Sequence, residues 1–122
     1  MNRKRILVTD DEPHVIRSLT FVLGKEGFDV VTAQDGEEAL RVAVEQKPDL
    51  MFLDIMMPKK NGYEVCEIIR KTPDLKSMYI IMLSAKGLAI DRSNAINAGA
   101  NEFMSKPFSL LDAVARVKTI LN

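Results

Sequence analysis

Five residues with side chains suited to chemistry stand directly after short apolar runs: Asp10 and Asp11, Asp54, Ser84, and Lys106. If these runs are strands ending at one edge of a sheet, three carboxylates, a hydroxyl and an ammonium lie together there. Carboxylates so close repel one another and raise each other's pKa unless a cation neutralises them. Mg²⁺ fits such a site, because it binds through one or two carboxylates and leaves positions free for a phosphoryl oxygen. The residue types therefore predict a Mg²⁺-dependent site for phosphoryl chemistry.

Within this set, Asp54 is the candidate nucleophile, since a carboxylate can attack phosphorus and hold the group as an acyl phosphate. Lys106 and Ser84 would stabilise the transferring group, the first by its charge and the second by donating a hydrogen bond. The structural alternative is that strand-end aspartates only cap helices or form Asx turns, and that Lys-Pro is a common loop pair. Five suitable residue types at successive strand ends favour the catalytic interpretation.

Five β–α units would position these residues. Continuous apolar or β-branched runs predict strands at 6–8, 28–33, 50–54, 79–83 and 102–104. Helical spacing of apolar residues follows each run: from Pro13 to 24–27, from 36 to the residue before Pro48, around 65–69 after a loop at 58–62, at 89–98, and at 110–121 with Ser109 as amino-terminal cap. This alternation predicts an α/β domain, a doubly wound three-layer sandwich on a parallel five-stranded sheet. In such sheets functional groups gather at the carboxyl ends of the strands.

Size and charge exclude several classes of protein. The 122 residues fit one domain, and 47% hydrophobic with 28% charged residues support an ordinary globular core. Seventeen basic and seventeen acidic residues give a formal net charge of +0, so direct nucleic-acid binding is not expected. No apolar run reaches the roughly 18 residues of a membrane span, and the start lacks a secretory signal. We expect a cytoplasmic protein with no membrane association, in which residues 1–122 form one domain without an output domain.

Four segments carry a resemblance to the receiver domain of two-component response regulators. They are ILVTDDEP with Asp10 and Asp11, LDIMMPKKNGYE with Asp54, LSAK with Ser84, and MSKPF with Lys106. The resemblance covers nearly the whole chain and is nearest to receivers of the OmpR/PhoB type. It implies the flavodoxin-like (βα)5 fold with strand order 2-1-3-4-5.

By this resemblance, Asp54 accepts a phosphoryl group from the phosphohistidine of a histidine kinase. Asp11 and Asp54 would ligate Mg²⁺ directly, Asp10 would act through a water, and the backbone carbonyl of Met56 would complete the protein's ligands. Met56 and Lys86 also resemble positions that tune the lifetime of the acyl phosphate. Such a domain is not a conventional turnover enzyme: it catalyses its own phosphorylation and slow dephosphorylation, and it controls a downstream output domain or protein.

The resemblance also implies a switch. Phosphorylation would draw Ser84 inward, and the space it leaves would admit Phe103, which stands where many members of the family carry Tyr. Core packing is the alternative role for Phe103. The face made by the fourth helix, fifth strand and fifth helix would then mediate phosphorylation-dependent homodimerisation. Charged residues there would pair between two copies, Arg92 with Asp112 and Glu102 with Arg116.

Three other classes compete with a phosphorylated signalling domain. A turnover phosphohydrolase of the aspartyl-phosphate type needs a second acid two residues after the nucleophile, where this chain has Met56. A nucleotide- or flavin-binding module needs a Gly-rich phosphate loop after the first strand, where Asp10 and Asp11 would repel a phosphate. An adaptor that is never phosphorylated would not need Asp54, Ser84 and Lys106 together. Two further residues are assigned no role in the site: His14, as a surface residue, and Cys66, as a small hydrophobe.

Overall fold

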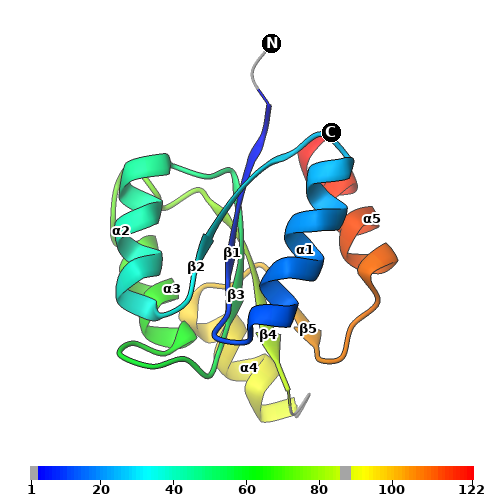
Figure 1. Ribbon diagram of the computed structural model, residues 1–122. Coiled ribbons are helices and arrows are strands. Elements are labelled where there is room, and N and C mark those ends of the chain that lie inside the picture. The colour runs from blue at the N-terminus through cyan, green and yellow to red at the C-terminus, as the bar shows by residue number, and fades with distance from the viewer. Residues whose placement is uncertain (1–2, 86–88) are drawn as a thin grey trace.

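A computed structural model describes residues 3–85 and 89–122, so Lys86 lies outside the described part of the chain. Strands and helices alternate throughout, as predicted (Figure 1). The strands are β1 (Arg5–Thr9), β2 (Asp29–Ala33), β3 (Leu50–Asp54), β4 (Tyr79–Ser84) and β5 (Glu102–Ser105). The helices are α1 (Pro13–Lys25), α2 (Gly36–Gln46), α3 (Gly62–Arg70), α4 (Ala89–Ala98) and α5 (Leu110–Leu121).

The strands form one parallel sheet in the order β2-β1-β3-β4-β5. Helices α1 and α5 cover one face of this sheet, and α2, α3 and α4 lie on the other side (Figure 1). This is the doubly wound arrangement expected when right-handed β–α crossovers run to both sides of the first strand. The predicted α/β flavodoxin-like (βα)5 fold with order 2-1-3-4-5 is confirmed.

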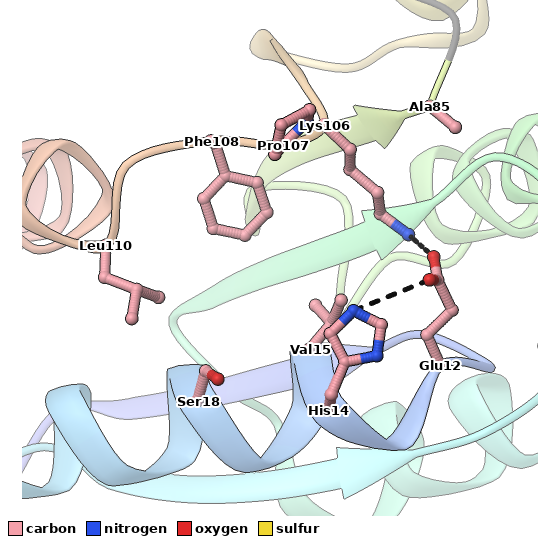
Figure 2. A pocket seen from close by; sticks show the side chains of 9 residues that line it. All are labelled: Glu12, His14, Val15, Ser18, Ala85, Lys106, Pro107, Phe108 and Leu110. Carbon is pink, nitrogen blue, oxygen red and sulfur yellow. Dashed lines mark hydrogen bonds and ion pairs between the residues drawn. The ribbon is translucent and has the colours of Figure 1, made fainter.

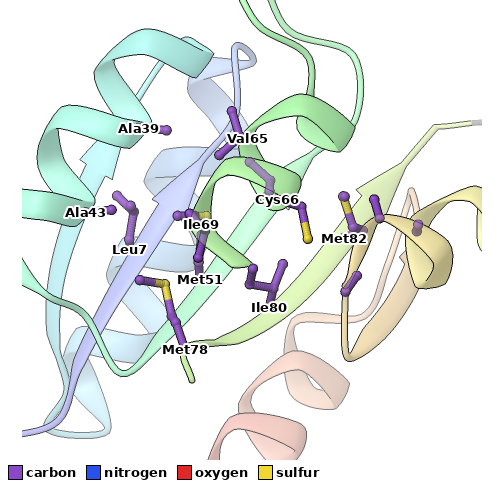
Figure 3. Packing of buried hydrophobic residues seen from close by; sticks show 14 of the residues in the cluster. Leu7, Ala39, Ala43, Met51, Val65, Cys66, Ile69, Met78, Ile80 and Met82 are labelled. Atoms are coloured by element: carbon purple, nitrogen blue, oxygen red, sulfur yellow. The ribbon is translucent and has the colours of Figure 1, made fainter. Parts of the chain in front are cut away.

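Two apolar clusters hold the layers together. Successive strand residues point to opposite faces, so Leu7, Met51 and Met82 pack under α2 and α3, while Val8 and Phe52 pack under α1 and α5. Figure 3 shows the first cluster between the sheet and the α2 and α3 helices. Strands buried on both faces explain why their sequences are continuous apolar runs rather than alternating ones.

The strand register brings the functional strand ends to one edge. Thr9 lies beside Leu53, Asp54 lies beside Leu83, and Ser84 lies beside Ser105. The carboxyl ends of β1, β3, β4 and β5 therefore lie at the same edge of the sheet. The residues that end β3 and β4, and those that follow β1 and β5, come together there. This edge lies at the bottom of Figure 1, opposite the amino terminus.

The helix ends follow local rules. The Ser109 hydroxyl accepts a hydrogen bond from the Asp112 amide at 3.2 Å, which confirms the predicted cap of α5. Helix α1 continues through Gly24 and ends at Lys25, inside the stretch expected to end it, and Gly27 adopts a φ of 95°. None of the helices in the described residues is long and apolar enough to cross a membrane.

Candidate functional site

An acid cluster lies where β1 ends. Asp10 is fully buried, and its Oδ1 accepts a hydrogen bond from the Glu12 amide at 2.9 Å, so the chain turns back over the sheet edge. Asp10, Asp11 and Glu12 each place a carboxylate oxygen within 4.8 Å of the others. Glu12 was not predicted as a site residue, although its position directly after the acidic pair was a signal for it.

Asp54 ends β3 beside this cluster and is only 4% exposed. Burial, followed by the negative charge of Asp10, raises the pKa of Asp54 to about 7. Lys106 and the backbone amide of Met56 act in the opposite direction, since both favour the ionised form. The expected repulsion between strand-end carboxylates is therefore present at Asp54.

Lys106 joins the acids. Its Nζ lies 2.7 Å from Asp10 Oδ2, 2.7 Å from Glu12 Oε1 and 3.6 Å from Asp54 Oδ1. Burial alone would lower the pKa of Lys106, but its contacts with Asp10 and Glu12 outweigh that effect and raise it. The hydrogen bond from Lys106 lowers the pKa of Glu12 in return. One ammonium thus sits among carboxylates that come from two different strand ends.

This donor set fits Mg²⁺. The four carboxylates of Asp10, Asp11, Glu12 and Asp54 are hard oxygen ligands, and the single ammonium of Lys106 cannot balance their charge. Among the described residues, the three-acid group within 4.8 Å contains Glu12 and not Asp54. The predicted ligand Met56 has an exposed side chain, and its backbone amide faces the Asp54 carboxylate.

Ser84, at the end of β4, is buried beside these groups. Its hydroxyl donates a hydrogen bond to Asp91 Oδ2 on α4 at 3.0 Å. Phe103 on β5 is also buried, and the Arg92 guanidinium lies 5.2 Å from the centre of its ring. The predicted switch residues thus both contact the first turns of α4, a connection that the sequence did not indicate.

The four predicted interface residues lie on α4, β5 and α5, as expected. Glu102 and Arg116 already form an ion pair within this chain, and the Tyr79 hydroxyl also donates to Glu102. The Arg116 hydrogen bond is the largest of the effects that together lower the pKa of Glu102. Asp112 is exposed in the first turn of α5.

A cavity of about 470 Å³ opens beside Lys106, between α1 and the loop that joins β5 to α5. Val15, Phe108 and Leu110 give it an apolar wall, and Glu12 and Lys106 lie at one end (Figure 2). His14 also lines this cavity, with its Nε2 3.7 Å from Glu12 Oε2. The buried Cys66 lies elsewhere, in the core under α3, where burial raises the pKa of its thiol to about 11.

Comparisons with known proteins agree with the predicted family. Residues 6–118 match the family described as the response regulator receiver domain. The alkaline phosphatase synthesis transcriptional regulatory protein PhoP of Bacillus subtilis is 47% identical over 120 residues, which are 98% of this chain and 49% of that protein. The chain spans about half the length of the curated relatives it matches.

Solved structures agree as well. A two-component response regulator from Clostridium difficile superposes with a TM-score of 0.91 at 28% identity, covering 98% of this chain and 96% of that one. The chemotaxis response regulator CheY4 of Vibrio cholerae superposes with a TM-score of 0.92 at 26% identity, covering 98% of this chain and 100% of that one.

Proposed function

The chain belongs to the family of response regulator receiver domains, and we propose that its Asp54 accepts a phosphoryl group from the phosphohistidine of a histidine kinase. One observation carries this proposal: the buried Asp54, whose pKa is about 7, lies 3.6 Å from an ammonium that two further acids hold in place. An acid, a cation and a hydroxyl at one sheet edge match the needs of phosphoryl transfer.

In the proposed reaction, an ionised Asp54 oxygen attacks phosphorus. The bond between phosphorus and the histidine nitrogen breaks, and the imidazole leaves with the bonding pair and takes up a proton. Asp11, Asp54 and the Met56 carbonyl would hold Mg²⁺ directly and Asp10 through a water, and the ion would neutralise the charge that phosphoryl oxygens bring to the acid cluster. Lys106 would turn its Nζ from Glu12 toward a phosphoryl oxygen, and the Ser84 hydroxyl would donate to another.

We expect hydrolysis of the acyl phosphate at such a site to be slow. The position two residues after Asp54 holds Met56 rather than an acid, so no side chain there activates a water against the acyl phosphate. We therefore infer self-catalysed phosphorylation and slow dephosphorylation rather than phosphohydrolase turnover. Residues 1–122 would act as a receiver unit that controls an output domain or protein in the cytoplasm.

We also propose that phosphorylation promotes a homodimer through α4, β5 and α5. Ile90 on α4 and Leu111 on α5 are 60% and 81% exposed, which leaves apolar surface for a second copy of this chain. Arg92 of one copy would meet Asp112 of the other. Because Glu102 and Arg116 are already paired within one chain, they would join this interface as a preformed pair. Such rim pairs set register more than affinity.

Intact mass spectrometry after incubation with acetyl phosphate and Mg²⁺ tests the phosphoacceptor proposal. We expect wild type to gain one labile phosphate only when Mg²⁺ is present, and Asp54→Asn to gain none. Asp74→Asn, which removes a largely exposed acid paired with Lys47, is the matched control and should behave as wild type. Uptake by Asp54→Asn would refute the assignment, and sustained release of phosphate over many turnovers would favour a phosphohydrolase.

A further inference from the structure

Ser84 hydrogen-bonds to a group outside the phosphoryl site. Its Oγ donates to Asp91 Oδ2 at 3.0 Å, and Asp91 lies in the first turn of α4. A serine hydroxyl carries one hydrogen and can donate to one strong acceptor at a time. The bond to Asp91 and a bond to a phosphoryl oxygen on Asp54 are therefore mutually exclusive.

Tyr63 on α3 lies near Asp91. The half-buried Tyr63 hydroxyl on α3 is within reach of Asp91 and Asn94, and burial, followed by the Asp91 charge, raises the pKa of Tyr63. Tyr63 packs against the core cluster under α3. Tyr63 thus places a hydroxyl near the Asp91 carboxylate, which accepts the Ser84 hydrogen.

The two ends of α4 are fastened in different ways. At the carboxyl end, Arg70 Nε donates to the Gly99 carbonyl at 2.8 Å, and its Nη1 donates to the Met78 carbonyl at 2.7 Å. At the amino end, the bond from Ser84 to Asp91 ties the helix to β4. The neighbouring Arg92 lies over the Phe103 ring. One turn of α4 therefore contacts both Ser84 and Phe103.

We propose that Asp91 is a positioning residue that holds Ser84 in the unphosphorylated arrangement, so that activation must break the Ser84–Asp91 bond. This inference rests on the proposed function. Transfer of the Ser84 hydrogen from Asp91 to a phosphoryl oxygen removes the bond that ties β4 to the amino end of α4, while Arg70 keeps the carboxyl end in place. The first turn can then pivot and shift Arg92 from the Phe103 ring. Asp91 thus opposes activation, and its loss favours the active state.

The test is calorimetric titration with beryllofluoride, a phosphoryl mimic, in the presence of Mg²⁺. Since apparent affinity scales with the fraction of molecules already in the competent state, Asp91→Ala should bind beryllofluoride more tightly than wild type, by about tenfold to a hundredfold for the loss of one charge-assisted hydrogen bond. Asp91→Asn, which keeps a weaker acceptor, should fall between them. Tyr63→Phe, which removes the hydroxyl near Asp91 but keeps the ring, should shift affinity in the same direction by less.

A double-mutant cycle separates this role from simple charge removal. In a Ser84→Ala background, the gain from Asp91→Ala should disappear, because there is no hydroxyl left to hold. An equal gain with and without Ser84 would overturn the proposal, as would affinity unchanged or weakened by Asp91→Ala. Asp74→Asn, which removes the same charge from a loop outside the site, should match wild type.

The same experiment distinguishes the two levels of inference. If wild type does not bind beryllofluoride and takes up no phosphate from acetyl phosphate, the phosphoacceptor function itself fails. If wild type does both and the Asp91 variants match it, only the role of Asp91 fails. Thermal unfolding of each variant identifies any that do not fold, and Tyr63→Phe then carries the test.

Discussion

At the scale of single residues, Asp54 is an acid that folding places in an unfavourable environment. Its pKa rises from 3.8 to about 7, so between these values the folded protein binds more protons than the unfolded chain. Stability without divalent ions should therefore fall as pH rises from about 4 to about 7. Asp54→Asn removes this penalty and should raise the free energy of unfolding by on the order of 1–3 kcal/mol at pH 8, with little gain near pH 4.

Urea unfolding at both pH values, in the presence of a chelator, measures this difference. Asp74→Asn, which removes a carboxylate that is 76% exposed, is the control and should change the free energy of unfolding little. A gain for Asp54→Asn that is the same at pH 8 and pH 4 would contradict the proposed cause.

Lys106 stabilises the folded protein, whereas the ionised Asp54 destabilises it. Lys106→Met leaves the buried Asp10 and Asp54 without their shared ammonium, and it should destabilise the protein by roughly 3–5 kcal/mol at pH 8. The loss should be smaller at pH 5, because Asp54, whose pKa is about 7, is then protonated and carries no charge that the ammonium must balance. Lys47→Met, which breaks an exposed pair with Asp74, should cost about 0–1 kcal/mol in the same urea titrations. Similar losses for the two variants would be evidence against a buried ion network.

Residue type and spacing were sufficient to predict that Asp10, Asp54 and Lys106 would meet. They were not sufficient to predict the contact of Glu12 with Lys106 or that of Asp91 with Ser84. Glu12 turns back toward Lys106 because the chain makes an Asx turn at Asp10. Asp91 reaches Ser84 only because of the orientation that α4 adopts against β4, and such orientation depends on packing rather than on local sequence.

At the scale of elements, apolar runs bounded by polar or glycine residues predicted the strands and helices well, since a strand buried on both faces has little freedom in composition. The glycines show where local reasoning needs the structure. Gly24 lies in α1, and a Cβ added there would have no other atom within 4 Å. Gly99 has a φ of 113°, and a Cβ added there would approach Arg70 Cγ at 2.7 Å. Glycine is thus dispensable near the end of α1 but required directly after the end of α4.

This contrast makes a prediction. Gly24→Ala should stabilise the protein by up to about 1 kcal/mol, through better helix propensity. Gly99→Ala should destabilise it by roughly 1–3 kcal/mol, because it strains the backbone and displaces the Arg70 side chain that holds the end of α4. Thermal unfolding of the two variants beside wild type measures both effects, and equal shifts would show that Gly99 carries no such constraint.

At the scale of the whole molecule, the proposed dimer is the property most open to direct measurement. With beryllofluoride and Mg²⁺, light scattering should show the mass rising from 13.7 kDa toward twice that value. Arg92→Asp should weaken this association, and adding Asp112→Arg should restore it, because the pair is then reversed rather than lost. A mass that stays at that of one chain in saturating beryllofluoride would argue against dimerisation through this face.

The contact between Glu12 and Lys106 joins positions 94 apart in the chain, through the first and last strand ends. A nascent or partly denatured polypeptide cannot assemble that contact until its final β–α unit has docked. Brief exposure to a small phosphodonor should consequently mark only molecules that have completed folding. The amount of acyl phosphate formed would then measure the fraction of molecules that have finished refolding.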